Sequence, residues 1–312
     1  MTTSLSDAGV QFADSSVLLS AAYSFGFKNR VINGAMKIDQ RNVGASQSFT
    51  AAAALAYSID RFYGFCTGAN VTGQRIALAN AQNRYRFTGL AGVTGVGFGQ
   101  RIESFNSLDL AGLNASLQVK LFSSSLTAIT WTAYYATTVD TFGTLATPTR
   151  TQFATGSFTI GAAEATYSAL LSVPAAATTG IEIVFTAGAL LGAQTLTIGD
   201  VQLEAGSQAT SFELERLQSV LSNCQRYYFK TLDAYTVQGN ADSSTRQLIS
   251  TYNFPVTLRA TPTGLTGAYS AFTNCTQASF TASVSSSVTS IIASAVGGFT
   301  ALLTWGAFSA EL

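Results

Sequence analysis

Residues Ile129-Thr-Trp-Thr-Ala-Tyr-Tyr135 give the clearest indication of the fold class of this chain. Ile129 and Trp131 fall on one parity and Tyr134 falls on the other, which is the period of a strand with one buried face. Trp131 is therefore predicted to lie in the core, and Tyr134 is the better candidate for a surface aromatic.

The same pattern extends outward over most of the chain. Short runs rich in Val, Ile, Phe, Tyr and Thr are separated by Gly and Asn clusters from Lys28 to Glu213, and the whole chain has only four prolines. Such runs predict an antiparallel β-sandwich, with a bulge expected at Gly199. The glycine-rich piece Gly92–Gly99 lacks the Lys-Ser/Thr of a phosphate-binding loop, and we expect it to form a turn between strands.

One helix is expected within this β pattern. Thr210 and Glu213 have the spacing of a capping box, and an apolar stripe at helical spacing follows them. The stripe consists of Leu214, Leu217, Val220 and Leu221. It would pack either against its own domain or in a three-fold bundle of the same helix from three chains.

These patterns predict an all-β protein: an antiparallel jelly-roll β-sandwich, one short connecting helix and a smaller C-terminal β domain. The predicted parts are an attachment segment at 1–27, a jelly roll at 28–210, a helix at 211–224 and a β domain at 225–312.

Composition narrows the function. Of the 312 residues 47% are hydrophobic and only 10% are charged, with 16 basic and 16 acidic side chains. So neutral a surface suggests that much of it is covered by other copies. It also argues against nucleic acid as a partner, since nucleic-acid binding rests on basic charge. Neither a transmembrane helix nor a signal peptide is expected.

The chain contains no histidine, which excludes Ser-His-Asp and Cys-His catalysis within one copy. Cys66, Cys224 and Cys275 are odd in number and far apart, so they predict buried free thiols rather than disulfides or a metal site. Among the carboxylates, Glu213, Glu215 and the nearby Glu204 form no convincing pair for glycoside hydrolysis. The protein is therefore predicted not to be an enzyme.

Several segments together resemble the jelly-roll tail fibre and tail-tip proteins encoded by bacteriophages and prophages, whose central domain is like a carbohydrate-binding module. The segments similar to the first strands of such domains are Asn29–Met36 with Asp39–Asn42, and Tyr57–Tyr63. Those similar to the closing strand, the helix and the C-terminal module are Asp200–Glu213, Leu221–Lys230, Phe254–Pro262 and Ala310–Leu312. Residues 8–21 look like a single copy of a fibre repeat.

The resemblance implies a virion protein, assembled in the host cytoplasm, that forms a homotrimer. It would attach to other tail or neck proteins through residues 1–27 and bind a host surface polysaccharide without entering a membrane. The alternative is a purely structural collar, neck or decoration fibre without a ligand. A polysaccharide-degrading tail enzyme is a third, less favoured reading.

The expected ligand site lies in the C-terminal domain, which would be distal if the N-terminal segment anchors the chain. Its most polar loop-like stretch is Asp233–Arg246. Tyr235 could stack on a sugar, while Asn240, Asp242 and Arg246 could bind hydroxyl groups. Tyr134 in the jelly roll is a second candidate, and an ordinary solvated hairpin loop is the alternative.

Related carbohydrate-binding modules often hold a structural Ca²⁺ near their first and last strands. Here this would involve Asn33 to Asp39 and Asp200, but Ala35 stands where an acidic residue is expected. Asp39 and Asp200 are thus weak calcium candidates, and we expect no required cofactor.

EDTA should accordingly leave the melting temperature almost unchanged, because a metal that bound only the native state would otherwise add stability. Calorimetry with and without EDTA measures this. A drop of many degrees that Ca²⁺ restores would contradict the expectation.

Overall fold

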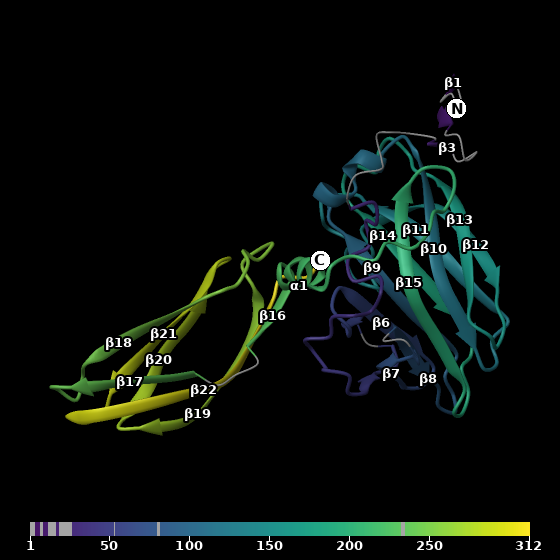
Figure 1. Cartoon of the computed structure of the whole chain (residues 1–312). Coiled ribbons are helices and arrows are strands. Elements are labelled where there is room, and N and C mark those ends of the chain that lie inside the picture. The colour runs from purple at the N-terminus through teal and green to yellow at the C-terminus, as the bar shows by residue number, and fades with distance from the viewer. Residues whose placement is uncertain are drawn as a thin grey trace.

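The computed structural model describes residues 4–6, 9–11, 17–18, 27–52, 54–79, 82–231 and 235–312. It consists of a large N-terminal β-sandwich, a single helix and a smaller, elongated β-sandwich (Figure 1). The large sandwich has the jelly-roll form predicted from the sequence, and the predicted fold class is confirmed.

The jelly roll is built from two six-stranded sheets in which all pairings are antiparallel. The first has the order β13 (Ala165–Ser172), β10 (Asn114–Ser123), β15 (Thr195–Ala205), β8 (Asn83–Thr88), β7 (Val71–Ala77) and β4 (Gln47–Phe49). The second has the order β12 (Arg150–Thr159), β11 (Ala128–Ala136), β14 (Ile181–Ala187), β9 (Gly95–Ile102), β6 (Phe62–Thr67) and β5 (Ala56–Tyr57). Two short 3₁₀ turns follow β9, η3 (Ser104–Asn106) and η4 (Leu108–Leu110).

The alternation in β11 sets the core as predicted. Ile129 and Trp131 are buried between the sheets, whereas Tyr134 is half-buried on the opposite parity. The expected turn is found at Gly92, which has a φ of +89°, but Gly97 and Gly99 lie inside β9. A Cβ atom would come within 2.1 Å of the Phe65 ring at Gly97 and 2.6 Å of the Tyr63 hydroxyl at Gly99. These glycines therefore make room for aromatic rings of β6.

Of two expectations for the region around β15, the predicted bulge is found and the predicted opening strand is not. The bulge appears in β15 between Gly199 and Gln202, where its pairing with β10 shifts register. The segment Asn29–Met36 is not a strand of either sheet. It runs beside β15, held by a hydrogen bond from the Arg30 backbone amide to the Leu203 carbonyl (2.8 Å). The Asn29 side chain donates to the Val201 carbonyl and accepts from the Leu203 backbone amide, both at 3.0 Å.

The helix α1 runs from Leu217 to Gln225 and begins later than residue 211. The capping-box prediction is wrong because both of its residues are bound elsewhere. The Thr210 backbone amide and hydroxyl both donate to the Glu204 carboxylate at 2.7 Å. The Glu213 carboxylate accepts from the Asn29 backbone amide at 2.8 Å. Of the apolar stripe, Val220 is buried in a small cluster with Ile38 and Cys224, so part of it packs on its own chain, whereas Leu214 and Leu217 remain exposed.

The C-terminal sandwich has two small sheets. One contains β16 (Tyr228–Lys230), β22 (Gly297–Ser309), β17 (Tyr235–Ala241) and β19 (Thr263–Thr273), and the other contains β18 (Gln247–Asn253), β21 (Ser286–Ala293) and β20 (Cys275–Ala282). Near the N terminus β1 (Ser4–Ser6), β2 (Gly9–Gln11) and β3 (Val17–Leu18) pair with one another. All three cysteines are free and buried, as predicted. Within the described ranges, no helix is long and apolar enough to cross a membrane.

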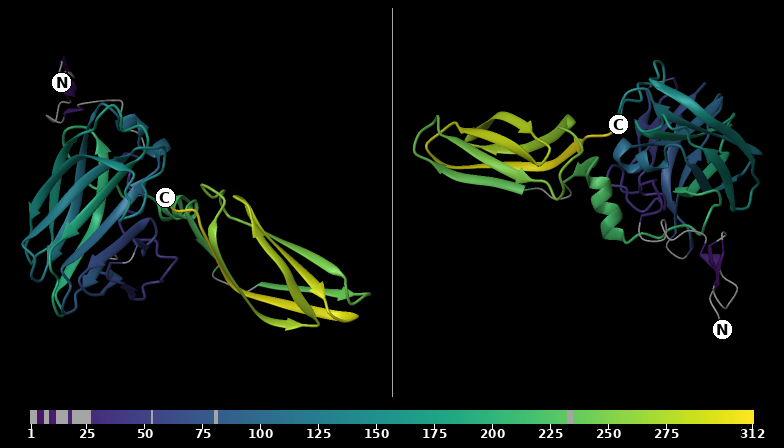
Figure 2. Two further views of the ribbon diagram at one scale, coloured as in Figure 1. Left: turned by 180° about the vertical axis from the view of Figure 1, so that it is seen from behind. Right: turned by 90° about the horizontal axis from the view of Figure 1, so that it is seen from above.

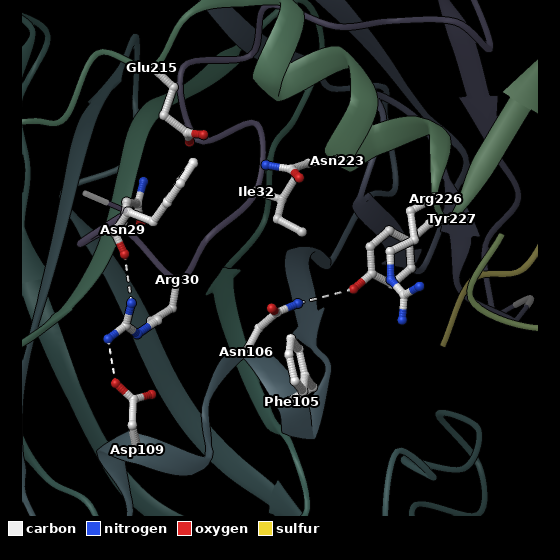
Figure 3. A pocket seen from close by; sticks show the side chains of 11 residues that line it. Asn29, Arg30, Ile32, Phe105, Asn106, Asp109, Glu215, Asn223, Arg226 and Tyr227 are labelled. Atoms are coloured by element: carbon white, nitrogen blue, oxygen red, sulfur yellow. Dashed lines mark hydrogen bonds and ion pairs between the residues drawn. The ribbon is translucent and has the colours of Figure 1, made fainter. Parts of the chain in front are cut away.

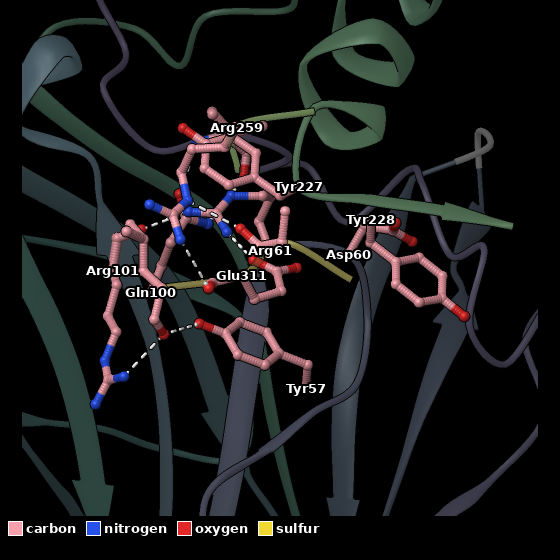
Figure 4. Close-up of polar contacts among 12 residues, drawn as sticks. Tyr57, Asp60, Arg61, Gln100, Arg101, Tyr227, Tyr228, Arg259 and Glu311 are labelled. Carbon is pink, nitrogen blue, oxygen red and sulfur yellow. Dashed lines mark hydrogen bonds and ion pairs between the residues drawn. The ribbon is translucent and has the colours of Figure 1, made fainter. Parts of the chain in front are cut away.

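A cluster of charged and aromatic residues ties the two sandwiches together, because the chain returns after β22 to the jelly roll (Figures 2 and 4). Glu311 forms ion pairs with Arg61 and with Arg41, the latter at 3.0 Å. The Leu312 oxygen accepts hydrogen bonds from Tyr57 and Arg101, both at 2.8 Å. We call this cluster, together with Asp60, Tyr227, Tyr228 and Arg259, the joint.

Aromatic rings complete the joint. The Arg61 guanidinium carbon lies 3.5 Å from the centre of the Tyr227 ring, and that of Arg41 lies 3.6 Å from the centre of the Tyr228 ring. Such cation–π contacts are strongest where water is excluded. Arg259 adds hydrogen bonds to the backbone oxygens of Ala310 (2.9 Å) and Glu311 (3.1 Å). The orientation of the small sandwich is therefore fixed mainly by polar contacts.

One carboxyl group in the joint is set to titrate in mildly acidic solution. Asp60 is fully buried, and its oxygens accept hydrogen bonds from the Gln40 amide (2.5 Å) and side chain (2.7 Å). Burial raises the pKa of Asp60 from 3.8 to about 6, although these hydrogen bonds and Arg41 oppose the rise. The charged form is therefore disfavoured in the folded protein.

Asp60 should make the protein less stable as pH rises from about 4 to about 6. In that window the folded state retains a proton that the unfolded state has lost, so the free energy of unfolding falls with pH, by about 3 kcal/mol in all. Asp60→Asn should remove this component. Urea unfolding of both proteins between pH 4 and 7 measures it as the difference between the two curves, and parallel curves would contradict the assignment.

Candidate functional site

A cleft of about 770 Å³ lies where the jelly roll meets α1 and the joint (Figure 3). The jelly roll contributes residues of the segment 27–32, which runs beside β15, and residues of the two 3₁₀ turns. The helix side contributes Glu215, just before α1, and residues at the end of α1 and directly after it. The lining residues are Phe27, Asn29, Arg30, Ile32, Phe105, Asn106, Asp109, Glu215, Asn223, Arg226 and Tyr227. Its volume is in the range of sites that hold small ligands.

Exposed phenylalanines are the unusual feature of this lining. Phe105 is 78% exposed and Phe27 is 61% exposed. Phe105 is held outward because Asp140 fixes the start of η3, accepting hydrogen bonds from the Ser104 amide (2.6 Å) and hydroxyl (3.1 Å). Leu110, fully buried, anchors the following turn. The ring is thus a solvated apolar surface on a fixed backbone, as a stacking contact requires.

The polar groups on the jelly-roll side are held in place by one another. Arg30 donates to Asp109 at 2.5 Å and to the Phe27 carbonyl at 2.6 Å. Asp109 is about half exposed, so one face of this ion pair is open to the cleft. The pair can offer both donors and acceptors to a ligand.

On the helix side, Tyr227 joins the cleft to the joint. Its hydroxyl donates to the buried Glu103 carboxylate at 2.8 Å and accepts from the side-chain amide of Asn106 at 3.3 Å. Arg226 also binds Glu103, at 3.0 Å, while its side chain stays 40% exposed. The orientation of Asn106 and Arg226 in the cleft therefore depends on the same buried carboxylate.

Glu215 is the remaining charged residue of the lining, and no hydrogen bond or ion pair to it is found within the described ranges. Burial raises the pKa of Glu215, repulsion from Glu213 raises it further, and Lys37 opposes the rise. A carboxylate in this setting gains from a ligand that donates hydrogen bonds, as sugar hydroxyls do.

The residues predicted as a ligand site in the C-terminal domain are spread along β17 and the turn after it. The strand ends at the tip of the small sandwich that points away from the jelly roll (Figure 1), where Ala241 pairs with Gly297, whereas Tyr235 pairs with Leu303 in the middle of β22. Asn240 is exposed near the end of β17. Asp242 and Arg246 form an exposed ion pair with each other at 2.5 Å. Tyr235 begins β17, but its side chain lies outside the described residues, as does Asp233. None of these contacts tests whether the residues bind a ligand, so ligand binding at this tip stays a prediction.

The other candidate residues are apart from the cleft and from one another. Tyr134 lies under Arg150, whose guanidinium carbon is 4.3 Å from the ring centre. Asp39 accepts from the amides of Asn42 (3.0 Å) and Gly44 (2.6 Å).

Cations already neutralise both weak calcium candidates. Asp39 lies 3.7 Å from Arg75, and Asp200 lies 3.0 Å from Arg84 and 3.2 Å from Lys120. No group of three or more potential ligands for a metal occurs among the residues that the structure describes. A calcium ion would have to displace an arginine or a lysine at either carboxylate.

Sequence reasoning missed Phe105, Arg30 and Asp109 as candidates. The segments 29–36 and 221–230 were noted only for their resemblance to strands and a helix end, yet both line the cleft. An isolated phenylalanine in a polar stretch, Ser104-Phe-Asn-Ser107, was the available signal for Phe105.

No protein-family model and no curated protein matches the sequence. Among solved structures, the chain is similar to a carbohydrate-binding module described as "CBM4" (14% identity, 56% of this chain and 98% of that one, TM-score 0.34). It is also similar to a putative sugar-binding protein from Bacteroides thetaiotaomicron (14%, 57% and 100%, TM-score 0.35). A third match is the enzymatically active domain of bacteriophage CBA120 tailspike protein 4 (14%, 60% and 23%, TM-score 0.33). We therefore base the functional proposal on this chain's own residues.

Replacing Tyr227 by phenylalanine should lower the free energy of unfolding by about 1–3 kcal/mol, because buried Glu103 loses a hydrogen-bond donor. Tyr167→Phe is the matched control, since Tyr167 is half-buried and no hydrogen bond to its hydroxyl is found within the described ranges. Urea unfolding compares the two variants, and an equal loss in both would show that the Glu103 contact contributes little.

Proposed function

We propose that this protein binds a glycan and that the cleft beside α1 holds the sugar. The exposed ring of Phe105 at the edge of a cleft lined by Asn, Arg, Asp and Glu side chains carries this proposal. Sugars bind by placing a C–H face on an aromatic ring while their hydroxyls bond polar side chains. The cleft offers both kinds of contact within one volume.

We further propose that the protein acts by binding and not by hydrolysis. Glycoside hydrolysis needs two carboxyl groups with separate roles. In the cleft, Asp109 is engaged by Arg30, and Glu215 lies apart from it, just before the helix (Figure 3). This arrangement suits recognition of hydroxyls better than proton transfer to a glycosidic bond.

As its biological setting we propose a bacteriophage or prophage tail, in which the bound glycan belongs to the host surface. The resemblance of Asp200–Glu213 and Leu221–Lys230 to tail fibre segments supports this proposal. Antibody labelling of purified virions in electron microscopy tests it, with label expected on the tail. The homotrimer and the attachment through residues 1–27 remain predictions of the same kind.

Phe105→Ala should weaken glycan binding about tenfold, a loss of about 1.4 kcal/mol, with an unchanged melting temperature because the ring is exposed. A glycan array with the purified protein identifies a ligand, and calorimetric titration then gives the dissociation constants. Phe272→Ala, at another exposed phenylalanine, is the matched control and should bind normally.

A further variant separates the two candidate sites. If binding is lost in Tyr235→Ala with Asp242→Ala but kept in Phe105→Ala, the ligand site is the tip of the small sandwich. If the array detects no glycan at all, the purely structural virion component becomes the better account.

A further inference from the structure

The two sides of the jelly roll end very differently. On one side the sheets end in β4 and β5, which are three and two residues long. On the other side they end in β13 and β12, which are eight and ten residues long. Short edge strands are one device that prevents a sheet from pairing with another chain. In this sandwich only the side that ends in β4 and β5 has such short edge strands.

The long edges also have few of the other protective devices. Residues Ala165–Ser172 of β13 include no charged residue and no proline, and the strand pairs with β10 without a bulge. In β12 the single charged residue is Arg150, at its first position, where it is bound to Glu182. The pairing of β12 with β11 has one bulge, at Phe153, which leaves Ala154–Thr159 in regular register. Among the described strands, β13 pairs only with β10 and β12 only with β11. Each therefore presents a row of backbone N–H and C=O groups that no strand satisfies.

The two edges form one surface. The Phe158 ring of β12 and the Tyr167 ring of β13 close the core between them, with centroids 5.5 Å apart. The strands run side by side along the same margin of the sandwich in Figure 1 and in the left view of Figure 2. A partner that binds here meets two strand edges separated by the spacing of packed sheets, about 10 Å.

We propose that this margin is an interface with a second copy of the chain, in which β13 pairs antiparallel with its counterpart and β12 pairs with its own. A two-fold axis normal to the sheets produces both pairings at once and extends each six-stranded sheet into the other copy. A single extended peptide would complete only one of the two edges. A second copy, by contrast, presents its own β12 and β13, which have the same spacing as the two edges that they would pair with.

Side chains next to the interface fit pairing of like with like. Ser168 and Leu170 are exposed in β13, with Leu170 at 55%, and Thr155 and Ser157 are exposed in β12. Like charges opposite each other would destabilise a two-fold strand pair, whereas hydroxyl-bearing and β-favouring residues stabilise it. An isologous contact of this kind closes at two copies. It therefore competes with the three-fold assembly expected from the sequence.

The test places charges on the proposed interface. Light scattering of the wild-type protein should give twice the mass of one chain, and hydrogen exchange should show amide protection in β13 and β12 that increases with protein concentration. Ser168→Lys with Leu170→Lys should reduce the mass to that of one chain and remove this protection, because the lysines repel across the axis. Val43→Lys with Leu90→Lys, at exposed positions elsewhere, should leave both readouts unchanged.

Three results would overturn the proposal. The first is a single-chain mass for the wild type at about 100 µM. The second is an assembly, trimeric or otherwise, whose β12 and β13 amides do not respond to concentration or to the lysines. The third is protection of these edges in a monomer at every concentration, which would mean that another segment of the same chain covers them.

Discussion

The contact between Arg61 and Glu311 holds the two sandwiches in one arrangement. Both side chains are almost completely buried. Without Glu311 the Arg61 guanidinium would be a buried charge without a carboxylate partner, whereas without Arg61 Glu311 would keep only its ion pair with Arg41. Breaking such a pair by removing one partner typically costs about 3–5 kcal/mol. The cleft depends on the same contact, because the Tyr227 ring lies on Arg61 while its hydroxyl orients Glu103 and Asn106. Joint and site are thus parts of one polar network.

Most of the charged residues of the C-terminal part of the chain belong to this network. After residue 225 the charged residues are Arg226, Lys230, Asp233, Asp242, Arg246, Arg259 and Glu311, and residues 260–310 contain none. Arg226 bonds Glu103, Lys230 bonds the Arg41 carbonyl, and Arg259 and Glu311 belong to the joint. Among the residues that the structure describes, the outer surface of this sandwich consequently carries hydroxyl, amide and apolar groups, apart from the Asp242–Arg246 pair at its tip.

Local patterns predicted the strands well and the site poorly. The alternation around Trp131 correctly gave a strand and its buried face, because period two is decided by neighbouring residues alone. The helix start was wrong because Thr210 and Glu213, which look like caps locally, are bound by Glu204 and Asn29, the latter 184 residues away from Glu213. The cleft could not be predicted for the same reason: Arg30, Phe105 and Arg226 meet only after the whole chain has folded.

That separation along the chain also bears on the order of folding. The contact between Arg61 and Glu311 spans 250 residues, whereas the pairings within each sandwich close far shorter loops. Contacts that close long loops carry a larger entropic cost and form late, while domains of this size fold as separate units. The chain should therefore pass through a state in which both sandwiches are complete and still unlinked. In that state the surfaces destined for the cleft face open solvent, and the cleft forms in the last step of folding.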